Sequence, residues 1–398
     1  PDVYEDIVTM GANAAKALMD RKGLVPDDIG RIDVATESAF DNSKPVSTYI
    51  AGCLEQVYDG DFHHANKGER KFACLSGTQC IDDAYNWIRA GRNRGRAALV
   101  IATDTALYER GDPGEATQGA GAVAMLIDED PDIVALSTEQ GYGSADETDF
   151  LKPNQQFPSV DGKRSIQVYL ARLREALEDY ESVAGDTHPD TFAYFPFHTP
   201  YPGMVRKAAL LGYRHITRDT EVEEALAADV GMQPREADFG SREAYEDAIR
   251  TYMDDLKRTD RYREWYERAI APTVAISERV GNWYTGSVHL ARLSALRAAA
   301  DAGVDLAGQR LLVGSYGSGA QAEIHAETVQ PGWRDAVAPI DVDGQLAARY
   351  DLSFEEYELV HDVHNHGKEV DVEAFTQPDG EFVFTGWGRM GERRYEYV

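Results

Sequence analysis

The stretch Lys71-Phe-Ala-Cys-Leu-Ser-Gly-Thr-Gln-Cys80 joins two elements of different hydrophobic period. The run Arg70 to Ala73 indicates the end of a buried strand, and the run Gly77 to Arg92 indicates a helix. Apolar residues of that helix share one face: Ile81, Ala84, Tyr85 and Ile88. Cys74 therefore falls at a strand-to-helix turn, where the helix dipole favours thiolate over thiol. This position predicts a nucleophile, although a lone free cysteine is more often an inert core residue.

The composition is that of a globular chain with room for two domains. It has 398 residues, 43% of them hydrophobic and 27% charged. No run of 18 apolar residues and no signal segment is present, so we expect no membrane span. Three cysteines are too few for a disulfide framework and match no zinc spacing. The simplest interpretation is a reduced, cytoplasmic protein without a metal site.

The charge is strongly acidic, with a formal net charge of -29. Phosphates would be repelled, which argues against nucleic acid as a partner. The acidic excess is spread along the chain and lysine is scarce among the basic residues. This pattern is typical of a cytosolic protein from a salt-in halophile, in which salt screens the self-repulsion. An acidic protein from a mesophile is the alternative.

Strands and helices alternate in the first half, which we place at residues 1–158. An amphipathic helix with Ile7, Met10, Ala14 and Leu18 on one face comes first and stops at Gly23. The pattern then predicts strands at 31–36 and 97–104, a helix at 46–58, and a strand at the end of 117–127. The alternation predicts an α/β fold with a mostly parallel sheet. Because a helix precedes the first strand, we expect a further strand ahead of Pro1.

The second half, residues 159–398, repeats a similar order. A long helix follows Ser165, and residues 192–198 form a strand that ends in His198. The charged stretch 219–268 indicates an insertion of surface helices. Later elements are a helix opened by residues 281–287, a strand into a glycine turn at 310–319, and a late strand at 382–386.

Four places carry candidate chemistry. Glu37, at a strand exit, is suited to acid–base work if burial raises its pKa, although most such residues are solvated loop carboxylates. His198 is suited to polarising a carbonyl, although a satisfied core histidine is the commoner case. Asn282 is able to bind a substrate or to cap the helix that begins there. The turn Ser315–Gly319 is able to aim N–H groups at an anion, or is only a turn.

These signals are weak singly, but they stand in a series of short motifs. The motifs are Ala35-Thr-Glu-Ser38, Ala73-Cys74, Ile101-Ala-Thr-Asp-Thr-Ala106 before Tyr108, Thr117-Gln-Gly-Ala-Gly-Ala-Val-Ala124, Val160-Asp-Gly-Lys163 with Ser165-Ile-Gln167, Phe197-His-Thr-Pro200, Gly281-Asn282 with Tyr284-Thr-Gly-Ser287, and Ser315-Tyr-Gly-Ser-Gly319. In sequence and order these motifs resemble the 3-hydroxy-3-methylglutaryl-CoA (HMG-CoA) synthase family of the thiolase superfamily. The resemblance covers nearly the whole chain, except 219–268.

The resemblance implies a thiolase-like fold, in which two similar halves form a five-layer α-β-α-β-α sandwich. It implies condensation of acetyl-CoA with acetoacetyl-CoA and water to HMG-CoA and CoA, which feeds the mevalonate pathway of isoprenoid synthesis. Cys74 would be the acetylated nucleophile, Glu37 the general base, and His198 the group that polarises acetoacetyl-CoA.

Binding positions follow from the same resemblance. The backbone N–H groups of Cys74 and Ser318 resemble an oxyanion hole. Thr117, Ser165 and Asn282 match positions that contact the acyl chain or CoA, and Lys207 matches a basic position near the CoA phosphates. Many relatives have a second lysine where this chain has Gly203, so Arg206 is expected to contribute.

Other condensing enzymes of the superfamily, ketoacyl synthases of type III and thiolases, are the main alternative. They lack a glutamate in the role of Glu37, which makes that residue the discriminating one. A scaffold without activity would be expected to lose Cys74, Glu37 or His198. We expect a homodimer that uses no cofactor beyond its CoA thioester substrates.

Overall fold

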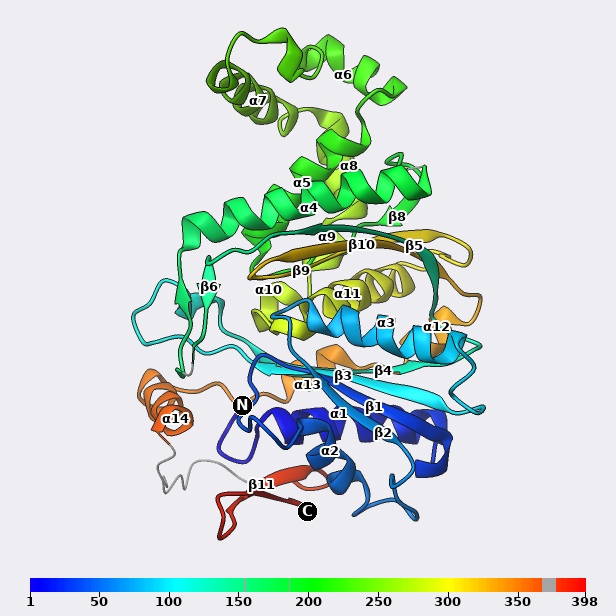
Figure 1. Ribbon diagram of the computed structural model, residues 1–398, viewed down its shortest axis with the longest axis vertical. Helices are drawn as coiled ribbons and strands as arrows, with labels where there is room; N and C mark the ends of the chain where they lie inside the picture. Colours follow the sequence, from blue (N-terminus) through cyan, green and yellow to red (C-terminus); the bar gives the residue numbers. More distant parts are fainter. Residues whose placement is uncertain (154, 186, 367–376) are drawn as a thin grey trace.

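Two four-stranded sheets and three layers of helices make up the body of the molecule (Figure 1). The structure is a computed structural model that describes residues 1–153, 155–185, 187–366 and 377–398. One outer layer holds α1 (Ile7–Lys22) and α2 (Val46–Leu54), the central layer α3 (Ser76–Arg89) and α11 (Ser287–Asp301), and the other outer layer α4 (Gly162–Ala184) and α5 (Pro202–Ile216). The expected five-layer α-β-α-β-α arrangement is confirmed.

The first sheet has the strand order β2-β1-β3-β4. Its strands are β1 (Ile29–Ala35), β2 (Asn66–Arg70), β3 (Ala97–Thr105) and β4 (Ala120–Ile127). β1 runs parallel to β2 and β3, whereas β4 is antiparallel to β3. β3 is buried almost throughout, as its continuous apolar run predicts. The carboxyl end of β1 thereby presents Glu37 close to the start of α3.

The second sheet repeats this pattern in the order β5-β10-β9-β8. Its strands are β5 (Val134–Ser144), β8 (Phe192–Tyr194), β9 (Arg310–Gly317) and β10 (Gln321–Val329). β8 and β9 are parallel and β10 is antiparallel to β9, so these three strands correspond to β1, β3 and β4. The two halves therefore share an internal structural repeat that no residue-level similarity reveals.

Two segments of the chain lie in a different half from the one that their sequence positions suggested. β5 already pairs with β10 of the second sheet, ahead of the boundary that we placed at residue 158. The end of the chain returns to the first half, where β11 (Phe382–Trp387) and β12 (Arg393–Tyr397) form a hairpin. Asn13 of α1 exchanges two hydrogen bonds with the backbone of Phe382. The late strand is confirmed. It packs on the outer helices of the first half, although we had assigned it to the second.

Two local expectations are wrong. The strand before Cys74 ends at Arg70 rather than Ala73, and it is a partly exposed edge strand rather than a buried one. In α1 the buried face includes Val8, Ala12, Ala15 and Met19, whereas Leu18 is only half-buried. The helix carries apolar residues on more than one side, so its sequence period alone did not select the face that packs on the sheet.

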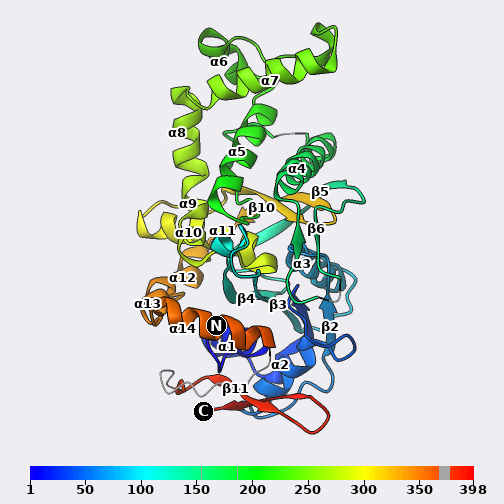
Figure 2. The same ribbon diagram turned by 90° about the vertical axis from the view of Figure 1, so that its left-hand side faces the viewer.

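The charged stretch 219–268 forms the projecting arm at the top of Figures 1 and 2. Its helices are α6 (Glu221–Val230), α7 (Arg242–Leu256) and α8 (Asp260–Ala269). The expected surface helices are confirmed, and α8 exposes its charged residues while it buries its apolar side. Tyr262 and Trp265 pack into the core of the second half, because an amphipathic helix buries its apolar side wherever a neighbour offers one.

The remaining elements are short or lie at the periphery: β6 (Phe150–Leu151), β7 (Ser159–Val160), α9 (Ala271–Val274), α10 (Ser277–Val280), α12 (Trp333–Val337), α13 (Val342–Ala347) and α14 (Phe354–His366). None of the helices in the described ranges is both long and apolar enough to cross a bilayer.

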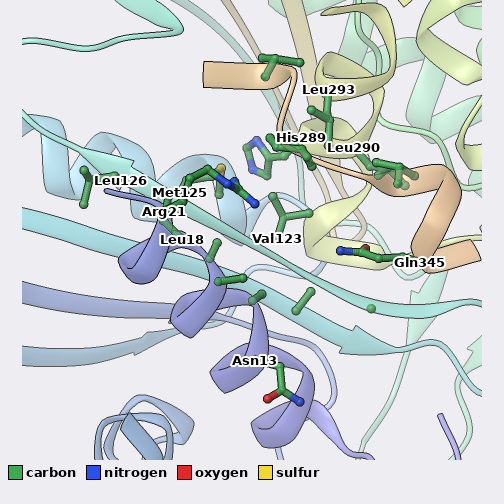
Figure 3. A pocket seen from close by; sticks show the side chains of 18 of the residues that line it. Asn13, Leu18, Arg21, Val123, Met125, Leu126, His289, Leu290, Leu293 and Gln345 are labelled. Atoms are coloured by element: carbon green, nitrogen blue, oxygen red, sulfur yellow. The ribbon is translucent and has the colours of Figure 1, made fainter. Parts of the chain in front are cut away.

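A large groove follows the free edge of β4, between α1 and α11 (Figure 3). Its volume is about 2130 Å³, and its lining includes Leu18, Val123, Met125 and Leu293. β4 is only half-buried along its whole length, although its sequence is apolar on both faces. Glu37, Cys74 and His198 do not line this groove.

Candidate active site

Cys74 lies in a strained turn at the start of α3. Ala73 has a φ of 44°, a left-handed conformation that costs a residue with a side chain about 1–3 kcal/mol. The turn is closed by hydrogen bonds from the N–H of Leu75 to Phe72 O (3.1 Å) and from the N–H of Ser76 to Ala73 O (3.3 Å). The turn places Cys74 just ahead of the helix, where its thiol reaches Glu37 beyond the end of β1.

The end of β9 packs directly against this turn. A Cβ on Gly317 would lie 2.5 Å from Phe72 O and 2.9 Å from Leu75 N, so only glycine allows this approach. The close contact joins the two halves at the nucleophile. It also brings the backbone of Ser318, the next residue, to the Cys74 side of the interface.

Glu37 and Cys74 are in direct contact, as the candidate roles require. The Cys74 thiol donates a hydrogen bond to Glu37 Oε1 over 2.9 Å. Burial, followed by the nearby Asp104 carboxylate, raises the pKa of Glu37 to about 8. Burial and the Glu37 charge raise the pKa of Cys74 well above its ordinary value. In the free site, burial and the neighbouring carboxylate therefore oppose the thiolate that the helix dipole favours.

Asp104 organises the loop that carries Glu37. Its Oδ1 accepts hydrogen bonds from the Glu37 N–H (2.7 Å), the Thr36 hydroxyl (3.0 Å) and the Ser38 hydroxyl (2.8 Å). Its Oδ2 accepts from the N–H (3.1 Å) and hydroxyl (2.5 Å) of Thr285, in the second half. These bonds satisfy a fully buried carboxylate and tie the base to the opposite half.

His198 is buried and lies four residues beyond β8, which ends at Tyr194 rather than at His198 as expected. Its N–H donates to Gly314 O on β9 (2.8 Å), and the Tyr169 hydroxyl donates to its carbonyl (3.0 Å). Among the described residues, its ring nitrogen Nδ1 has no hydrogen-bond partner. Burial lowers the pKa of His198 to about 3, so the ring is neutral. A buried ring nitrogen without a partner suits a group that binds a substrate oxygen.

Asn282 and Thr117 meet at the same interface. The N–H of Asn282 donates to Thr117 O over 3.0 Å, and Asn282 Oδ1 accepts from the Tyr284 N–H and the Ser287 hydroxyl, each at 2.8 Å. The side-chain oxygen of Asn282 thus holds the turn before α11, but it does not cap that helix, whose N-cap residue is Gly286. A cavity of about 330 Å³ beside Thr117 is lined by Tyr201 and Gly281 among others.

The remaining expected binding residues lie further out. Arg206 and Lys207 are exposed on α5, and Arg206 forms a loose ion pair with Glu278 (3.9 Å) near Gly281. Ser165 lies in the first turn of α4, where its N–H donates to Asp161 O (2.8 Å). The hydrogen bonds found in the described part of the chain do not join Ser165 to Cys74, Glu37 or His198.

Sequence reasoning did not single out four residues of this site as functional. Asp104 ends an apolar strand run, which is a signal that could have found it. Tyr284 packs at Cys74, and Tyr108 interacts with Tyr284 through its hydroxyl and lies within electrostatic reach of Cys74. Lys152 lies close enough to Glu37 and Asp104 for its charge to favour their ionised forms. No sequence period marks Lys152, which follows the two-residue strand β6.

A metal site is not formed by the described residues, since no three His, Cys, Asp or Glu side chains gather as ligands there. The first half instead combines a thiol with a carboxylate of raised pKa, and the second half supplies a neutral imidazole beside Tyr316, which lies within electrostatic reach of Cys74. Such a set is able to acylate the thiol and to remove a proton from a carbon next to a carbonyl group.

Comparison with known proteins gives one consistent result. Residues 2–132 match the family model "Hydroxymethylglutaryl-coenzyme A synthase N terminal", and residues 141–384 match its C-terminal counterpart. A hydroxymethylglutaryl-CoA synthase of Haloferax volcanii is 80% identical over this whole chain and 89% of its own length. This relative supports the expectation of a halophilic archaeal source.

More distantly related proteins lead to the same family. Hydroxymethylglutaryl-CoA synthase A of Dictyostelium discoideum is 29% identical, covering 98% of this chain and 81% of its own. The solved structure of MvaS in complex with 3-hydroxy-3-methylglutaryl coenzyme A aligns with a TM-score of 0.82 and 30% identity, over 100% of this chain and 88% of that one. An HMG-CoA synthase complexed with CoA aligns with a TM-score of 0.75 and 27% identity, over 100% and 88%. On these matches and on its fold, the chain belongs to the hydroxymethylglutaryl-CoA synthase family.

Proposed function

We propose that the chain condenses acetyl-CoA with acetoacetyl-CoA and water to give HMG-CoA and free CoA. The observation that carries this proposal is the 2.9 Å contact between the Cys74 sulfur and Glu37 Oε1. It places a nucleophile and a base at one acyl group, as a reaction with an acyl-enzyme and a carbanion step requires. The product supplies the mevalonate pathway of isoprenoid synthesis, which is the known role of this family.

Acetyl transfer comes first. The Cys74 sulfur attacks the thioester carbonyl of acetyl-CoA, the bond to the CoA sulfur breaks, and the thiol proton leaves with CoA. The backbone N–H groups of Cys74 and Ser318 stabilise the oxyanion. The contact of Gly317 with the Cys74 turn supports this role, because it brings the two backbones to the same side.

Carbon–carbon bond formation follows. Glu37 removes a proton from the acetyl methyl group, for which a carboxyl pKa of about 8 is well matched to neutral pH. The enolate attacks the ketone carbon of acetoacetyl-CoA, and the ketone oxygen takes up one proton. His198 donates a hydrogen bond to that oxygen as a neutral ring, since its pKa of about 3 excludes an imidazolium at physiological pH.

Hydrolysis completes the cycle. Water attacks the thioester between the condensed acyl group and Cys74, the C–S bond breaks, and the sulfur regains its proton. The product leaves with a free carboxylate where it was bound to Cys74 and with CoA at its other end.

Thr117, Ser165 and Asn282 contact the acyl chain or CoA, while Arg206 and Lys207 on α5 bind CoA phosphates in place of a lysine at Gly203. We propose a cytoplasmic homodimer that needs no further cofactor.

The experiment assays CoA release and acetoacetyl-CoA loss in molar KCl, with mass spectrometry of the protein after incubation with acetyl-CoA. We expect both activities in the parent and an acetyl adduct on the Cys74 peptide. Cys74→Ser should lose the adduct and condensation together, while Cys53→Ser should keep both, since Cys53 lies in the core of the first half. An adduct on Cys53 or Cys80 instead would contradict the assignment.

A further inference from the structure

A loop of the first half, residues 106–118, forms one wall of the candidate site. Tyr108 and Thr117 lie near its two ends and interact through their side chains. Tyr108 also interacts with Tyr284 and lies within electrostatic reach of Cys74 and Glu37. The position of this loop therefore sets the space available to an acyl group beside Cys74.

The Gln118 side chain holds the two ends of this loop together. Its Oε1 accepts a hydrogen bond from the Tyr108 N–H over 2.6 Å. Its backbone pairs with Asn282, whose N–H donates to Thr117 O over 3.0 Å. A rotation of the Gln118 amide would break its hydrogen bond with the Tyr108 N–H. The rotamer of this side chain therefore determines where the loop 106–118 lies beside the site.

The group that fixes this rotamer comes from the far end of the chain. Gln118 Nε2 donates to the Tyr357 hydroxyl on α14 over 3.1 Å, and that hydroxyl donates to Glu115 Oε1 over 2.6 Å. The bond from Tyr357 is the main cause that holds the pKa of the Glu115 carboxyl below its ordinary value. The tyrosine hydroxyl is thus shared between two residues of the loop, as both donor and acceptor.

Two more contacts tie α14 to the same loop. The ring nitrogen Nε2 of His361 lies 2.9 Å from Tyr108 O, within hydrogen-bond distance. Arg110 of the loop forms an ion pair with Glu358. In Figure 2, α14 is the orange helix that crosses the front of the molecule. The contacts on Tyr108, Arg110, Glu115 and Gln118 show that one face of α14 serves the loop along its length.

We propose that Tyr357 is a positioning residue for substrate binding, which holds Gln118, and through it Tyr108 and Thr117, in the geometry that accepts acetoacetyl-CoA. This inference rests on the proposed function. It assigns α14 a role in the site, although the helix carries none of the nine residues expected from the sequence. A purely structural role would leave substrate affinity unchanged once the protein is folded.

The test is Tyr357→Phe, which removes the shared hydroxyl and keeps the ring. Because about two hydrogen bonds between neutral or singly charged groups are lost, we expect the KM for acetoacetyl-CoA to rise about 5- to 30-fold. The kcat should stay within about threefold, because Cys74, Glu37 and His198 are untouched. Tyr350→Phe is the matched control, since Tyr350 is 64% exposed and bonds only loosely to Glu356 (3.5 Å). It should leave KM and kcat unchanged.

A double-mutant cycle with Gln118→Ala tests whether Tyr357 acts on substrate binding through Gln118. If Tyr357 acts through Gln118, the double variant should have the KM of Gln118→Ala alone. Independent, multiplying effects would overturn the inference, as would an unchanged KM in Tyr357→Phe or a fall in kcat alone. Gln118→Ala also serves as the second variant if Tyr357→Phe folds poorly.

The proposed function fails in a different way. A parent protein that neither turns over nor binds acetoacetyl-CoA by calorimetry would overturn both proposals. An active parent whose KM does not respond to Tyr357→Phe would overturn only the positioning role.

Discussion

At the residue scale, the chemistry depends on the Glu37 carboxyl group, whose pKa is raised by burial. Glu37 shares its surroundings with Asp104, whose own pKa burial raises, and with the cation of Lys152. The like charge opposes ionisation of Glu37 and the lysine favours it. The balance places the pKa of the base at about 8, where a modest change in pH alters the fraction that is able to take a proton.

Glu37→Gln should separate the two half-reactions. Condensation should fall by about 10²–10⁴, because the amide accepts no proton. Acetylation of Cys74 should stay within about tenfold, because the variant also removes the charge that raises the pKa of the thiol. Rapid-quench measurement of both steps on one preparation checks this. Equal loss of both steps in a folded variant would instead assign Glu37 to activation of the thiol.

The same variant should change the pH dependence of stability in a direction set by linkage. The Glu37 pKa rises from 4.5 to about 8 on folding, so the folded state binds the proton more tightly and the parent loses stability between these two pH values. Glu37→Gln lacks this loss. Its unfolding midpoint should therefore rise relative to the parent from about pH 5 to pH 9, by the equivalent of a few kcal/mol. A constant difference across that range would contradict the raised pKa.

Lys152→Met should shift the pH profile of condensation to higher pH. Loss of the cation removes a contribution that lowers the pKa of Glu37, so the base ionises later. Lys152→Arg keeps the charge and is the control. The measurement is kcat/KM against pH for both variants. A profile that moves equally in both would show that shape rather than charge is responsible.

At the element scale, glycine contacts hold the halves together at the site. Gly281 has a φ of 75°, and a Cβ there would lie 2.1 Å from Gln118 O. This glycine therefore allows the turn before α11 to press against the loop that carries Thr117. Gly317, at the end of β9, likewise allows that strand to approach the Cys74 turn closely. Strands and helices thus bring the residues near, and these close backbone contacts set the final distances.

Gly281→Ala should cost more than backbone strain alone. The matched control is Gly303→Ala, because Gly303 has a similar φ of 70° but no atom within 4 Å of the added Cβ. The control should lose about 1–2 kcal/mol of stability and keep its activity. Gly281→Ala should lose more stability and most of kcat/KM, since Gln118 must move. Thermal unfolding and steady-state assays distinguish the two, and equal behaviour of both variants would contradict the contact.

At the scale of the whole molecule, the net charge of -29 sets the solvent that the fold requires. Self-repulsion destabilises the compact state until salt screens it, and the screening length falls from about 10 Å at 0.1 M to about 3 Å at 1 M. The unfolding midpoint should therefore rise steeply with KCl between these concentrations. Sucrose at equal osmolality is the control, because it favours burial without screening. Equal rises in both solutes would remove the electrostatic explanation.

The sequence by itself determined the class of fold and the chemical groups, because these depend on local patterns. The alternation of strand and helix runs predicts two α/β halves, and short motifs mark Glu37, Cys74, His198 and Asn282. The tertiary structure decided what depends on contacts between distant segments. It showed that β5 belongs to the second sheet, that the end of the chain packs on the first half, and that Tyr357 reaches Gln118. It also showed that burial beside a carboxylate raises the pKa of Cys74, which is not visible in sequence, whereas the helix start that favours a thiolate is.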